Sequence, residues 1–415
     1  MDTNWSVRAE ELSAGALAWL VDAAREDGAG LAWPSRPGDD ETMPTLYSGT
    51  AGIVLALLEA HAHFGDDRYG EVALRGARNL VSVVDAGWED SSLYFGLTGI
   101  AVALHAVHER LDDKDAGDAA GRALDLVRRR FDGTRWGPLF ELLGGNAGIA
   151  LGALAVGDPD LALLAVEPYP RTAETTAHGV NWETRVGRVA RQHHISHGTL
   201  GIVAALTAVG RTTGRDDLVE LAVAGAADVV SRDEDGPAGF LVAHSHPPDR
   251  PELIDRYNFG WCQGPAGDAQ VFRLLHNMLG DERWSALADR CWYTVTHCGL
   301  PERLRPRFWD NNGHCCGTAG VLALACDRAV ERGDGWDFAE LLAADLAAHA
   351  TVDDAGTRWS NVEHRATPSE LPPHTGWAMG NAGIVRELLR FARIGAGRDA
   401  AYAVTWPDQP PARSV

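Results

Sequence analysis

A short phrase built on two glycines recurs seven times along the chain and constrains its fold more than any other feature. Each copy reads Gly, two residues, Gly, and then an apolar run, as in YSGTAGIVLAL. Successive copies begin 47 to 66 residues apart, which is about the length of one helical hairpin with its loops. The repeat therefore predicts one structural unit used seven times. The first glycines of the copies are Gly49, Gly96, Gly145, Gly198, Gly264, Gly317 and Gly380.

The segments around the glycines predict an all-α protein. Each glycine pair opens a run, such as IVLALLEAHAHF, that is apolar nearly all round and suits a buried helix. Amphipathic segments lie between these runs, so we expect about fourteen helices in seven pairs. An open solenoid and a closed ring would both satisfy such pairs. The buried runs favour the ring, an α/α toroid of seven inner and seven outer helices that forms a single domain over residues 1–415. The amphipathic segments are 7–25, 71–84, 120–131, 218–230, 286–295 and 338–350.

The turns between the paired glycines lead to further expectations about the loops. Two glycines in a four-residue turn permit positive φ and close backbone approach where each inner helix starts. All the inner N-termini should gather at one end, where unpaired amides and positive dipole ends favour anions and thiolates. Proline-bearing loops at 232–260, 299–313 and 364–376 lengthen the spacers, and we expect residues 157–195 to form an irregular insertion.

Charge and hydropathy exclude several classes of protein. The chain has 58 acidic and 37 basic residues and a net charge of −21, which argues against a nucleic acid as partner. It has no apolar stretch long enough to span a membrane and no signal-peptide pattern, so we expect a cytoplasmic protein. The basic residues are nearly all arginine, a composition typical of a high-GC bacterium. Six cysteines are too few for a disulfide framework, and clustered cysteines more often indicate metal binding or catalysis.

Four chemically active side chains stand directly before the glycine pairs. Cys262 and Cys315 lie two residues before the first glycine of their copies, while Cys316 and His197 lie one residue before theirs. If the copies are structurally equivalent, the repeat brings these three thiols and the imidazole to the same end of the ring. Three thiolates suit Zn²⁺, and three protein ligands leave the fourth position open, as in a catalytic site. The alternatives are that the thiols are small core residues and that His197 is a structural histidine.

The other cysteines and two neighbouring histidines do not share this register. We expect the cysteines to be packing residues and the histidines to be surface or loop residues. His314, directly before the cysteine pair, is an alternative ligand or a residue that supports one. The residues outside the register are Cys291, Cys298, Cys326, His193 and His194.

A zinc ion held by three thiolates favours one kind of chemistry over another. Such a site has a net negative charge, so its ion is a weaker Lewis acid than one held by histidines and would activate water poorly. It could instead bind a substrate thiol, lower the pKa of that thiol, and leave the thiolate electron-rich enough to attack. The predicted reaction is therefore thiol alkylation rather than hydrolysis.

These motifs resemble those of the lanthionine synthetase C-like proteins, the cyclases of lanthipeptide biosynthesis and their relatives. The resemblance covers essentially the whole chain and is most specific at SHGTLG, WCQGPAG and HCCGTAG. It implies an α/α toroid with a catalytic zinc that adds a Cys thiol to dehydroalanine or dehydrobutyrine. It also implies that Cys262, Cys315 and Cys316 hold the zinc. The family most often has His where this chain has Cys316, which is similar to a three-cysteine subgroup with a more reactive zinc-bound thiolate.

The resemblance also indicates residues for acid–base chemistry. His197 matches the histidine of the family's Ser-His-Gly motif, which is proposed to act as acid or base near the metal. Many members have an Asp four residues before the first glycine of the third copy, where this chain has Glu141. Some members have an Arg four residues before the first cysteine ligand. This chain has Asn258 there and Arg256 two residues earlier, so the role is not carried over.

We therefore expect a zinc-dependent lanthipeptide cyclase that forms (methyl)lanthionine thioether rings in a dehydrated precursor peptide. The toroid accounts for the chain, so dehydration would come from separate dehydratase or kinase/lyase enzymes. One alternative is the addition of glutathione or another small thiol to dehydrated residues. Another is a non-catalytic scaffold in a peptide-modifying complex. Glycosidases and terpene cyclases also use α/α toroids, but their paired carboxylates and Asp-rich metal motifs are not evident here.

Overall fold

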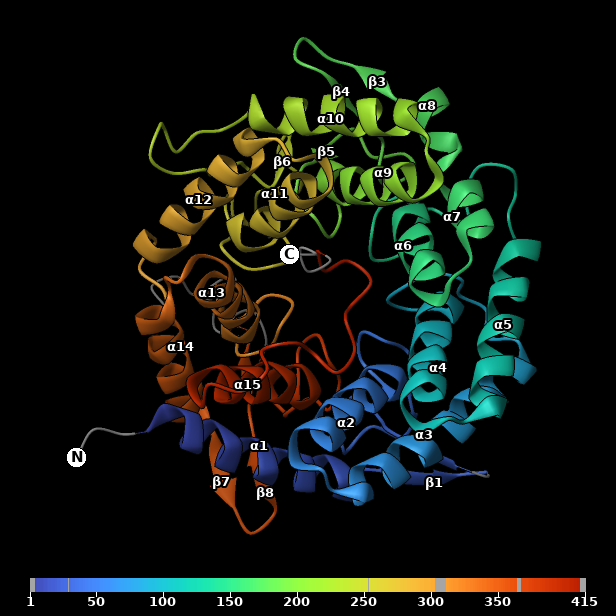
Figure 1. Cartoon of the computed structure of the whole chain (residues 1–415), viewed down its shortest axis with the longest axis vertical. Coiled ribbons are helices and arrows are strands. Elements are labelled where there is room, and N and C mark those ends of the chain that lie inside the picture. The colour runs from blue at the N-terminus through green and yellow to red at the C-terminus, as the bar shows by residue number, and fades with distance from the viewer. Residues whose placement is uncertain (1–3, 29, 253, 303–310, 364–366, 411–415) are drawn as a thin grey trace. The chain divides into compact units, whose positions relative to one another are not determined.

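The glycine phrases of the sequence mark the starts of seven helices (Figure 1). The computed structural model describes residues 4–410 apart from 29, 253, 303–310 and 364–366, so each of the three proline-bearing loops falls partly outside the described residues. Each of these helices begins one residue after the first glycine of a copy, and we call them the glycine helices. They are α2 (Thr50–Phe64), α4 (Leu97–Leu111), α6 (Asn146–Val156), α9 (Thr199–Thr213), α11 (Pro265–Leu279), α13 (Thr318–Arg332) and α15 (Asn381–Gly395).

A second set of helices alternates with the glycine helices along the described chain. Six of them coincide with the amphipathic segments expected from the sequence. The seventh, α7 (Pro159–Val166), and the short α8 (Pro168–Thr172) lie within residues 157–195, so the expected irregular insertion is wrong there. The sequence of α7, PDLALLAV, lacks a polar face because the helix packs between α6 and α9. The six others are α1 (Trp5–Asp22), α3 (Asp67–Ala86), α5 (Lys114–Arg129), α10 (Asp216–Val230), α12 (Glu282–His297) and α14 (Trp336–His349).

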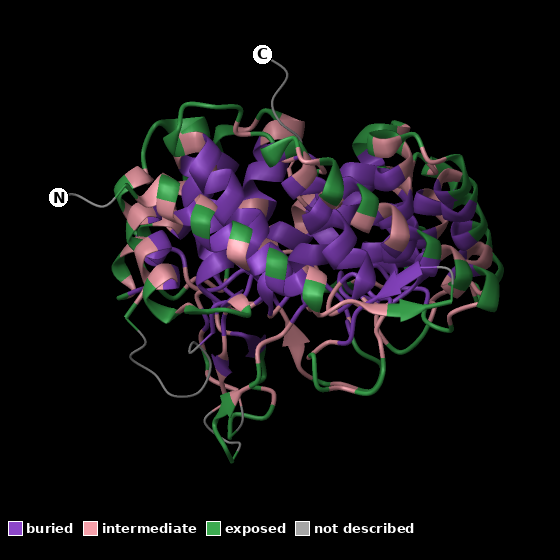
Figure 2. Cartoon of the chain, turned by 90° about the horizontal axis from the view of Figure 1, so that it is seen from below, coloured by how far each residue is buried: buried purple, intermediate pink, exposed green. Residues whose placement is uncertain are grey.

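The glycine helices supply a large share of the core. In α9 every residue from Thr199 to Gly210 is buried, whereas α3 buries one face and exposes the other. Figure 2 shows the buried residues gathered along the helices. None of the helices in the described part of the chain is long and apolar enough to cross a membrane.

The contacts divide the chain into two compact units. The first comprises Met1–Gly87, Ala103–Ala120 and Pro301–Thr405. In this unit α1 packs against α15, α2 against α3, and α13 against α14, while α15 also contacts α13 and α2. The last glycine helix therefore packs against the first helix of the chain.

The second unit repeats the same packing rule. It comprises Trp88–Val102, Gly121–Leu300 and Trp406–Val415. Here α6 packs against α7, α9 against α10, and α11 against α12, while α9 also contacts α6 and α11. In both units a glycine helix thus packs against a partner helix and against other glycine helices.

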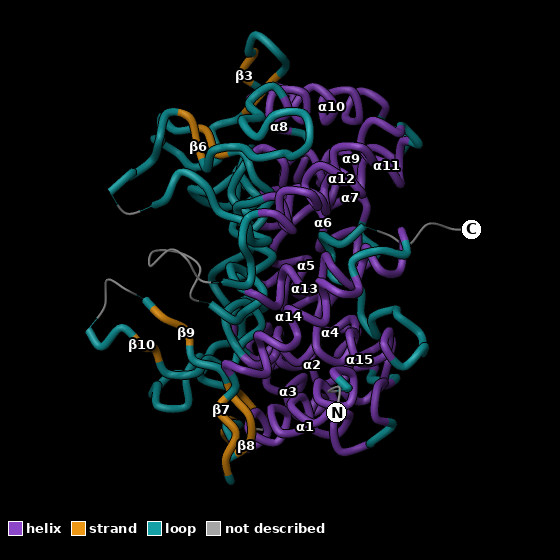
Figure 3. Tube along the Cα trace, turned by 90° about the vertical axis from the view of Figure 1, so that its left-hand side faces the viewer, coloured by secondary structure: helices purple, strands orange, loops and turns teal. Residues whose placement is uncertain are grey.

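Short antiparallel hairpins occupy the long loops, and Figure 3 shows the labelled strands of each unit on one side of the helices of that unit. One of the strand pairs is not a hairpin, because it joins the loop before α9 to the loop after α10. In the first unit the pairs are β1 (Arg25–Asp27) with β2 (Gly30–Ala32), β7 (Thr351–Asp353) with β8 (Gly356–Arg358), and β9 (Asn361–Val362) with β10 (Glu370–Leu371). In the second they are β3 (Glu174–Thr175) with β4 (Val180–Asn181), and β5 (Arg191–Gln192) with β6 (Ser245–His246).

Close packing, and not an unusual backbone angle, explains the paired glycines. The first glycine of a copy caps its helix with an extended backbone, as at Gly145, where φ is −130°. A methyl group on the second glycine, Gly148, would overlap the carbonyl oxygen of Leu142 and would lie 2.8 Å from Cβ of Leu93 in the preceding copy. The expectation of positive φ is therefore wrong, and the expectation of close approach is confirmed.

Candidate metal centre and neighbouring residues

A ladder of backbone hydrogen bonds connects the loops before the glycine helices. It uses the residue two positions before the first glycine of each copy. In the second unit the amide of Tyr94 donates to the carbonyl of Leu143 (3.1 Å), Leu143 donates to Ser196 (3.3 Å), and Ser196 donates to Cys262 (3.2 Å). Cys262 therefore occupies the same structural position in its loop as three residues of unrelated type in theirs.

The first unit contains the same ladder with Cys315 in it. The amide of Cys315 donates to the carbonyl of Ala378 (2.8 Å), and Ala378 donates to Tyr47 (2.9 Å). The hydroxyl of Tyr47 also donates to Sγ of Cys315 (3.4 Å), and the thiol of Cys316 lies 3.5 Å from the same sulfur. Tyr47 was not among the predicted residues, although its position two residues before Gly49 matches that of Cys315.

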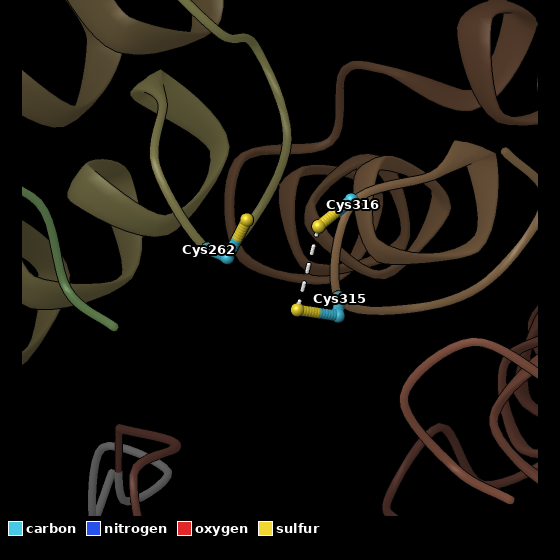
Figure 4. Close-up of side chains that lie close together, drawn as sticks. All are labelled: Cys262, Cys315 and Cys316. Atoms are coloured by element: carbon cyan, nitrogen blue, oxygen red, sulfur yellow. Dashed lines mark hydrogen bonds between the residues drawn. The ribbon is translucent and has the colours of Figure 1, made fainter. Parts of the chain in front are cut away.

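Three thiols in the described part of the chain form a group that could hold a metal ion. The Sγ atoms of Cys262, Cys315 and Cys316 lie within 4.8 Å of one another (Figure 4). Cys262 and Cys315 are buried and Cys316 is half-buried. Three sulfur ligands suit zinc and disfavour magnesium and calcium. The register in the sequence thus selected the three cysteines that the structure brings together.

The remaining cysteines lie in or at the end of helices and are not part of this group. Cys291 and Cys326 are fully buried among helix residues, and Cys298 follows α12. Burial raises the pKa of Cys298 to about 11, that of Cys326 to about 12, and that of Cys291 well above its usual range. These side chains therefore remain thiols at neutral pH, which fits the packing role expected for them.

His197 lies beside Glu141, as the resemblance implied. Nδ1 of His197 is 3.4 Å from Oε1 of Glu141, and the imidazole side chain is 30% exposed while the carboxylate is 1% exposed. Glu141 also accepts the backbone amides of Leu143 (2.5 Å) and Gly144 (3.2 Å) in its own loop. A carboxylate fixed in this way can orient an imidazole that remains accessible from outside.

His193 and His194 lie in the loop before α9, which is one of the two expected places, but both are buried, so a surface position is wrong. Nδ1 of His194 lies 2.9 and 3.0 Å from the two carboxylate oxygens of Asp268, and both side chains are almost fully buried. The cause is long-range, because the pairing of β5 with β6 covers this loop with residues from beyond α10. Asp268 was also missed, although it occupies a position where the other six copies have Ile or Val.

His314 and Arg256 are engaged in contacts of their own. Nδ1 of His314 is 3.2 Å from Oε1 of Glu387, and its ring lies 4.5 Å from the ring of Trp377. Arg256 forms an exposed ion pair with Glu234 at 2.6 Å. These contacts indicate structural roles for His314 and Arg256. Asn258 is buried and accepts a backbone amide of its own loop.

First-turn amides of the glycine helices α9 and α13 are not free, contrary to expectation. In α9 the amide of Leu200 donates to the carbonyl of His193 (3.0 Å), and in α13 the amide of Thr318 donates to the carbonyl of Asn311 (3.2 Å). The loop before each of these helices therefore satisfies amides that an anion would otherwise bind. Only the dipole of the helix remains to favour negative charge there.

Comparisons with known proteins agree on fold and family. Residues 40–250 and 248–341 match the family model of lanthionine synthetase C-like proteins. No curated protein matches the chain. Among solved structures, nisin cyclase is similar over 98% of this chain and 97% of its own, with a TM-score of 0.67 and 16% identity.

Two carbohydrate-active enzymes are similar at a lower level. An unsaturated glucuronyl hydrolase specific for heparin has a TM-score of 0.51 and 12% identity over 96% of this chain and 99% of its own. An α-1,6-mannanase of Salegentibacter sp. HEL1_6 has a TM-score of 0.50 and 12% identity over 94% of this chain and 99% of its own. At such identities the likeness concerns the fold alone. Together with nisin cyclase it confirms the expected fold class, an all-α, α/α toroid. Since the family model covers most of its length, this chain belongs to the lanthionine synthetase C-like family.

Proposed function

We propose that this protein is a zinc-dependent cyclase that adds a peptide cysteine thiol to a dehydroalanine or dehydrobutyrine residue and so closes a (methyl)lanthionine ring. Membership of the family and the fold-level likeness to nisin cyclase support the proposal. The observation that carries it is the group of three thiols, whose sulfur atoms lie within 4.8 Å of one another. A separate dehydratase or kinase/lyase system would supply the dehydrated peptide.

Cys262, Cys315 and Cys316 would hold the metal in this proposal. Zinc bound there supplies a Lewis acid that lowers the pKa of a substrate thiol and keeps it as a thiolate at neutral pH. Tyr47 donates its hydroxyl to Sγ of Cys315, so it would orient that ligand and withdraw some of its charge. The donor set of the chain thus matches the metal that the chemistry requires.

The addition itself forms one bond and moves one proton. The thiolate sulfur attacks the β-carbon of the dehydrated residue, a C–S bond forms, and the electron pair of the C=C bond moves toward the α-carbon and its carbonyl. The α-carbon then takes a proton, which balances the proton lost from the thiol, so the peptide changes structure without changing mass.

His197 is the residue to which we assign delivery of the proton to the α-carbon. Its ring is partly exposed and is held 3.4 Å from a buried carboxylate, Glu141. That carboxylate is fixed by two backbone amides, so it positions the ring and stabilises its protonated form. A positioned imidazole of this kind typically accelerates proton transfer by about 10²- to 10⁴-fold.

The test is to mix the protein with a synthetic peptide that contains one dehydroalanine and one cysteine. We expect free thiol to disappear with no change in mass, and the Cys262→Ala variant to proceed at the uncatalysed rate. The control variant is Cys298→Ala, which removes a half-buried thiol outside the group and should keep the wild-type rate. A wild-type protein no faster than buffer would contradict the proposal.

A second arm separates ring closure from addition of a small thiol. The peptide then contains dehydroalanine but no cysteine, and glutathione is added. Ring closure as the function predicts that the mass of this peptide stays unchanged over the time in which the cysteine peptide cyclises. Faster addition of glutathione than ring closure would instead assign the protein to small-thiol addition.

A further inference from the structure

A cavity of about 610 Å³ lies in the second unit beside the loop that carries His197. Its volume is within the range of small-molecule and peptide side-chain sites in other proteins. Its wall includes three histidines, of which His193 and His244 are buried and His246 is exposed, together with apolar side chains from the segment that follows α10. The apolar residues are Val242, Pro248, Pro251 and Ile254.

The pairing of β5 with β6 fixes the two imidazoles relative to His197. Arg191 is opposite His246 in this strand pair, and extending the register by two residues places His193 opposite His244. The carbonyl of His193 accepts the amide of Leu200 in the first turn of α9 (3.0 Å). His193 on the cavity wall and His197 four residues later therefore belong to one rigid turn.

Two histidines that line this cavity each have a ring nitrogen with unused hydrogen-bonding capacity. Within the described part of the chain, Nδ1 of His193 and Nδ1 of His244 are buried and have no hydrogen-bond partner. The two residues are 1% and 6% exposed. Burial lowers the pKa of His244 to about 3 and that of His193 well below its usual value, so both rings are neutral at pH 7. A neutral imidazole pairs well with an uncharged polar group such as a peptide amide.

The charged groups on the wall are mostly neutralised within the protein. Four of them form ion pairs within the same unit, so they leave little net charge for a charged ligand to meet. The carboxylate of Asp255 also lines the cavity and would repel an acidic ligand. The pairs are Arg232 with Asp228 (3.0 Å), Arg256 with Glu234 (2.6 Å), and Asp249 with Arg188 (3.2 Å).

We propose that this cavity binds an uncharged segment of the substrate peptide, next to the dehydrated residue that His197 protonates. The inference rests on the proposed function. Amides of the bound segment pair with His193 and His244, and an uncharged side chain of the segment contacts the apolar wall. The cavity thereby selects the residues that flank the site of ring closure.

The test measures binding without chemistry. The probe is a short fluorescein-labelled peptide with one dehydroalanine, uncharged flanking residues, and alanine in place of cysteine. Fluorescence anisotropy gives its Kd for the wild-type protein and for Ala243→Trp, which fills the cavity. We expect the substitution to raise the Kd by about tenfold or more. Val189→Trp, at a position that is 78% exposed and outside the cavity, should leave the Kd unchanged.

Each outcome bears on the inference separately from the proposed function. An equal Kd for the wild type and Ala243→Trp overturns the cavity assignment, as does a wild type that cyclises the cysteine peptide but does not bind the probe. Tight binding of a probe with aspartate at the flanking positions also overturns it. If Ala243→Trp loses helical circular dichroism, Pro251→Trp at the exposed rim takes its place, with the same expected rise in Kd. Binding that depends on the cavity together with no cyclisation would overturn the proposed function instead.

Discussion

Two histidines in loops before glycine helices each lie beside a glutamate at a similar distance, yet their surroundings differ. Nδ1 of His197 is 3.4 Å from Glu141, and Nδ1 of His314 is 3.2 Å from Glu387. The side chain of His197 is 30% exposed, whereas that of His314 is 5% exposed. The first pair is therefore open to a substrate and the second is closed.

The closed pair belongs to a network of buried charges. Glu387 is fully buried and lies 2.9 Å from the guanidinium of Arg386, and it accepts the hydroxyl of Tyr402 at 2.5 Å. Burial alone would raise its pKa, but the charge of Arg386 and the hydrogen bonds of His314 and Tyr402 lower the pKa to about 2. A carboxylate that is always ionised and fully surrounded stabilises the fold and has no proton to exchange at neutral pH.

The carboxylate of the open pair is held by a different kind of group. Glu141 accepts two amides of its own loop and faces one imidazole. The comparison shows that the distance between a histidine and a carboxylate does not by itself identify an acid–base pair. The kind of group that holds the carboxylate, a backbone amide or a guanidinium, and the exposure of the ring distinguish the two roles.

The largest expected effect concerns the open pair. His197→Asn should lower kcat for ring closure by about 10²- to 10⁴-fold, because the α-carbon loses its proton donor. Zinc content and the denaturant midpoint should stay at wild-type values, since the ring is partly exposed. His178→Asn, at an exposed position, is the matched control. A kcat within twofold of wild type would remove His197 from the reaction.

The closed pair should respond in stability and not in chemistry. Arg386→Met leaves Glu387 buried without its guanidinium, which we expect to lower the free energy of unfolding by about 3–5 kcal/mol. Equilibrium unfolding in urea measures this loss. The exposed pair of Arg283 with Asp281 supplies the control, because Arg283→Met should cost less than about 1 kcal/mol. Equal losses from the two variants would contradict the distinction drawn between the pairs.

A pH dependence distinguishes the buried His244 from the exposed imidazoles. Its pKa falls from 6.5 to about 3 in the folded protein because burial penalises the charged ring. Between these two pH values the unfolded chain binds a proton at His244 and the folded chain does not. The free energy of unfolding therefore declines as the pH falls below about 6.5. At pH 4.5 the neutral His244 should lower the free energy of unfolding by about 2–3 kcal/mol relative to pH 7.

His244→Phe tests that value because phenylalanine cannot take up a proton. Unfolding free energies at pH 7 and pH 4.5 should differ by about 2–3 kcal/mol less in the variant than in the wild type. Comparing the difference between the two pH values in each protein cancels any effect of altered packing that is the same at both pH values. Identical pH dependence in the two proteins would show that His244 titrates normally in the fold.

The smallest expected effect comes from Glu141→Gln. Glutamine keeps the size of the side chain and can still accept the amides of Leu143 and Gly144, but it lacks the charge that stabilises a protonated His197. We expect kcat to fall by about tenfold and the alkaline limb of its pH profile, where the proton donor loses its proton, to shift to more acidic values. A loss as large as that of His197→Asn would mean that the carboxylate takes part in proton transfer directly.

Repeat register predicted much of the fold and of the candidate site. Cys262 and Cys315 occupy equivalent places in the two backbone ladders because each stands two residues before a capping glycine. The glycine helices begin where the phrases do, because a first glycine such as Gly145 caps the helix and a close contact at a second glycine such as Gly148 leaves no room for a side chain. The expectation of a single domain over residues 1–415 stays a prediction.

Interactions between distant segments account for what the sequence did not predict. His193 and His194 are buried because strand β6 covers their loop, and no local pattern signals that pairing. The buried arginines of α15 are satisfied by the segment after that helix, as Arg390 is by the carbonyl of Ala400. Helix α7 was not predicted because its sequence has no polar face and so lacks the alternation of polar and apolar residues that indicates an amphipathic helix.

The central claim is that three cysteines chosen by repeat register hold one catalytic zinc ion. Elemental analysis by mass spectrometry of the purified wild type, Cys262→Ala and Cys298→Ala tests it most directly. The account predicts close to one zinc per chain in the wild type and in Cys298→Ala, and almost none in Cys262→Ala, with helical circular dichroism unchanged. A zinc-free wild type after incubation with zinc, or full zinc content in Cys262→Ala, would contradict it.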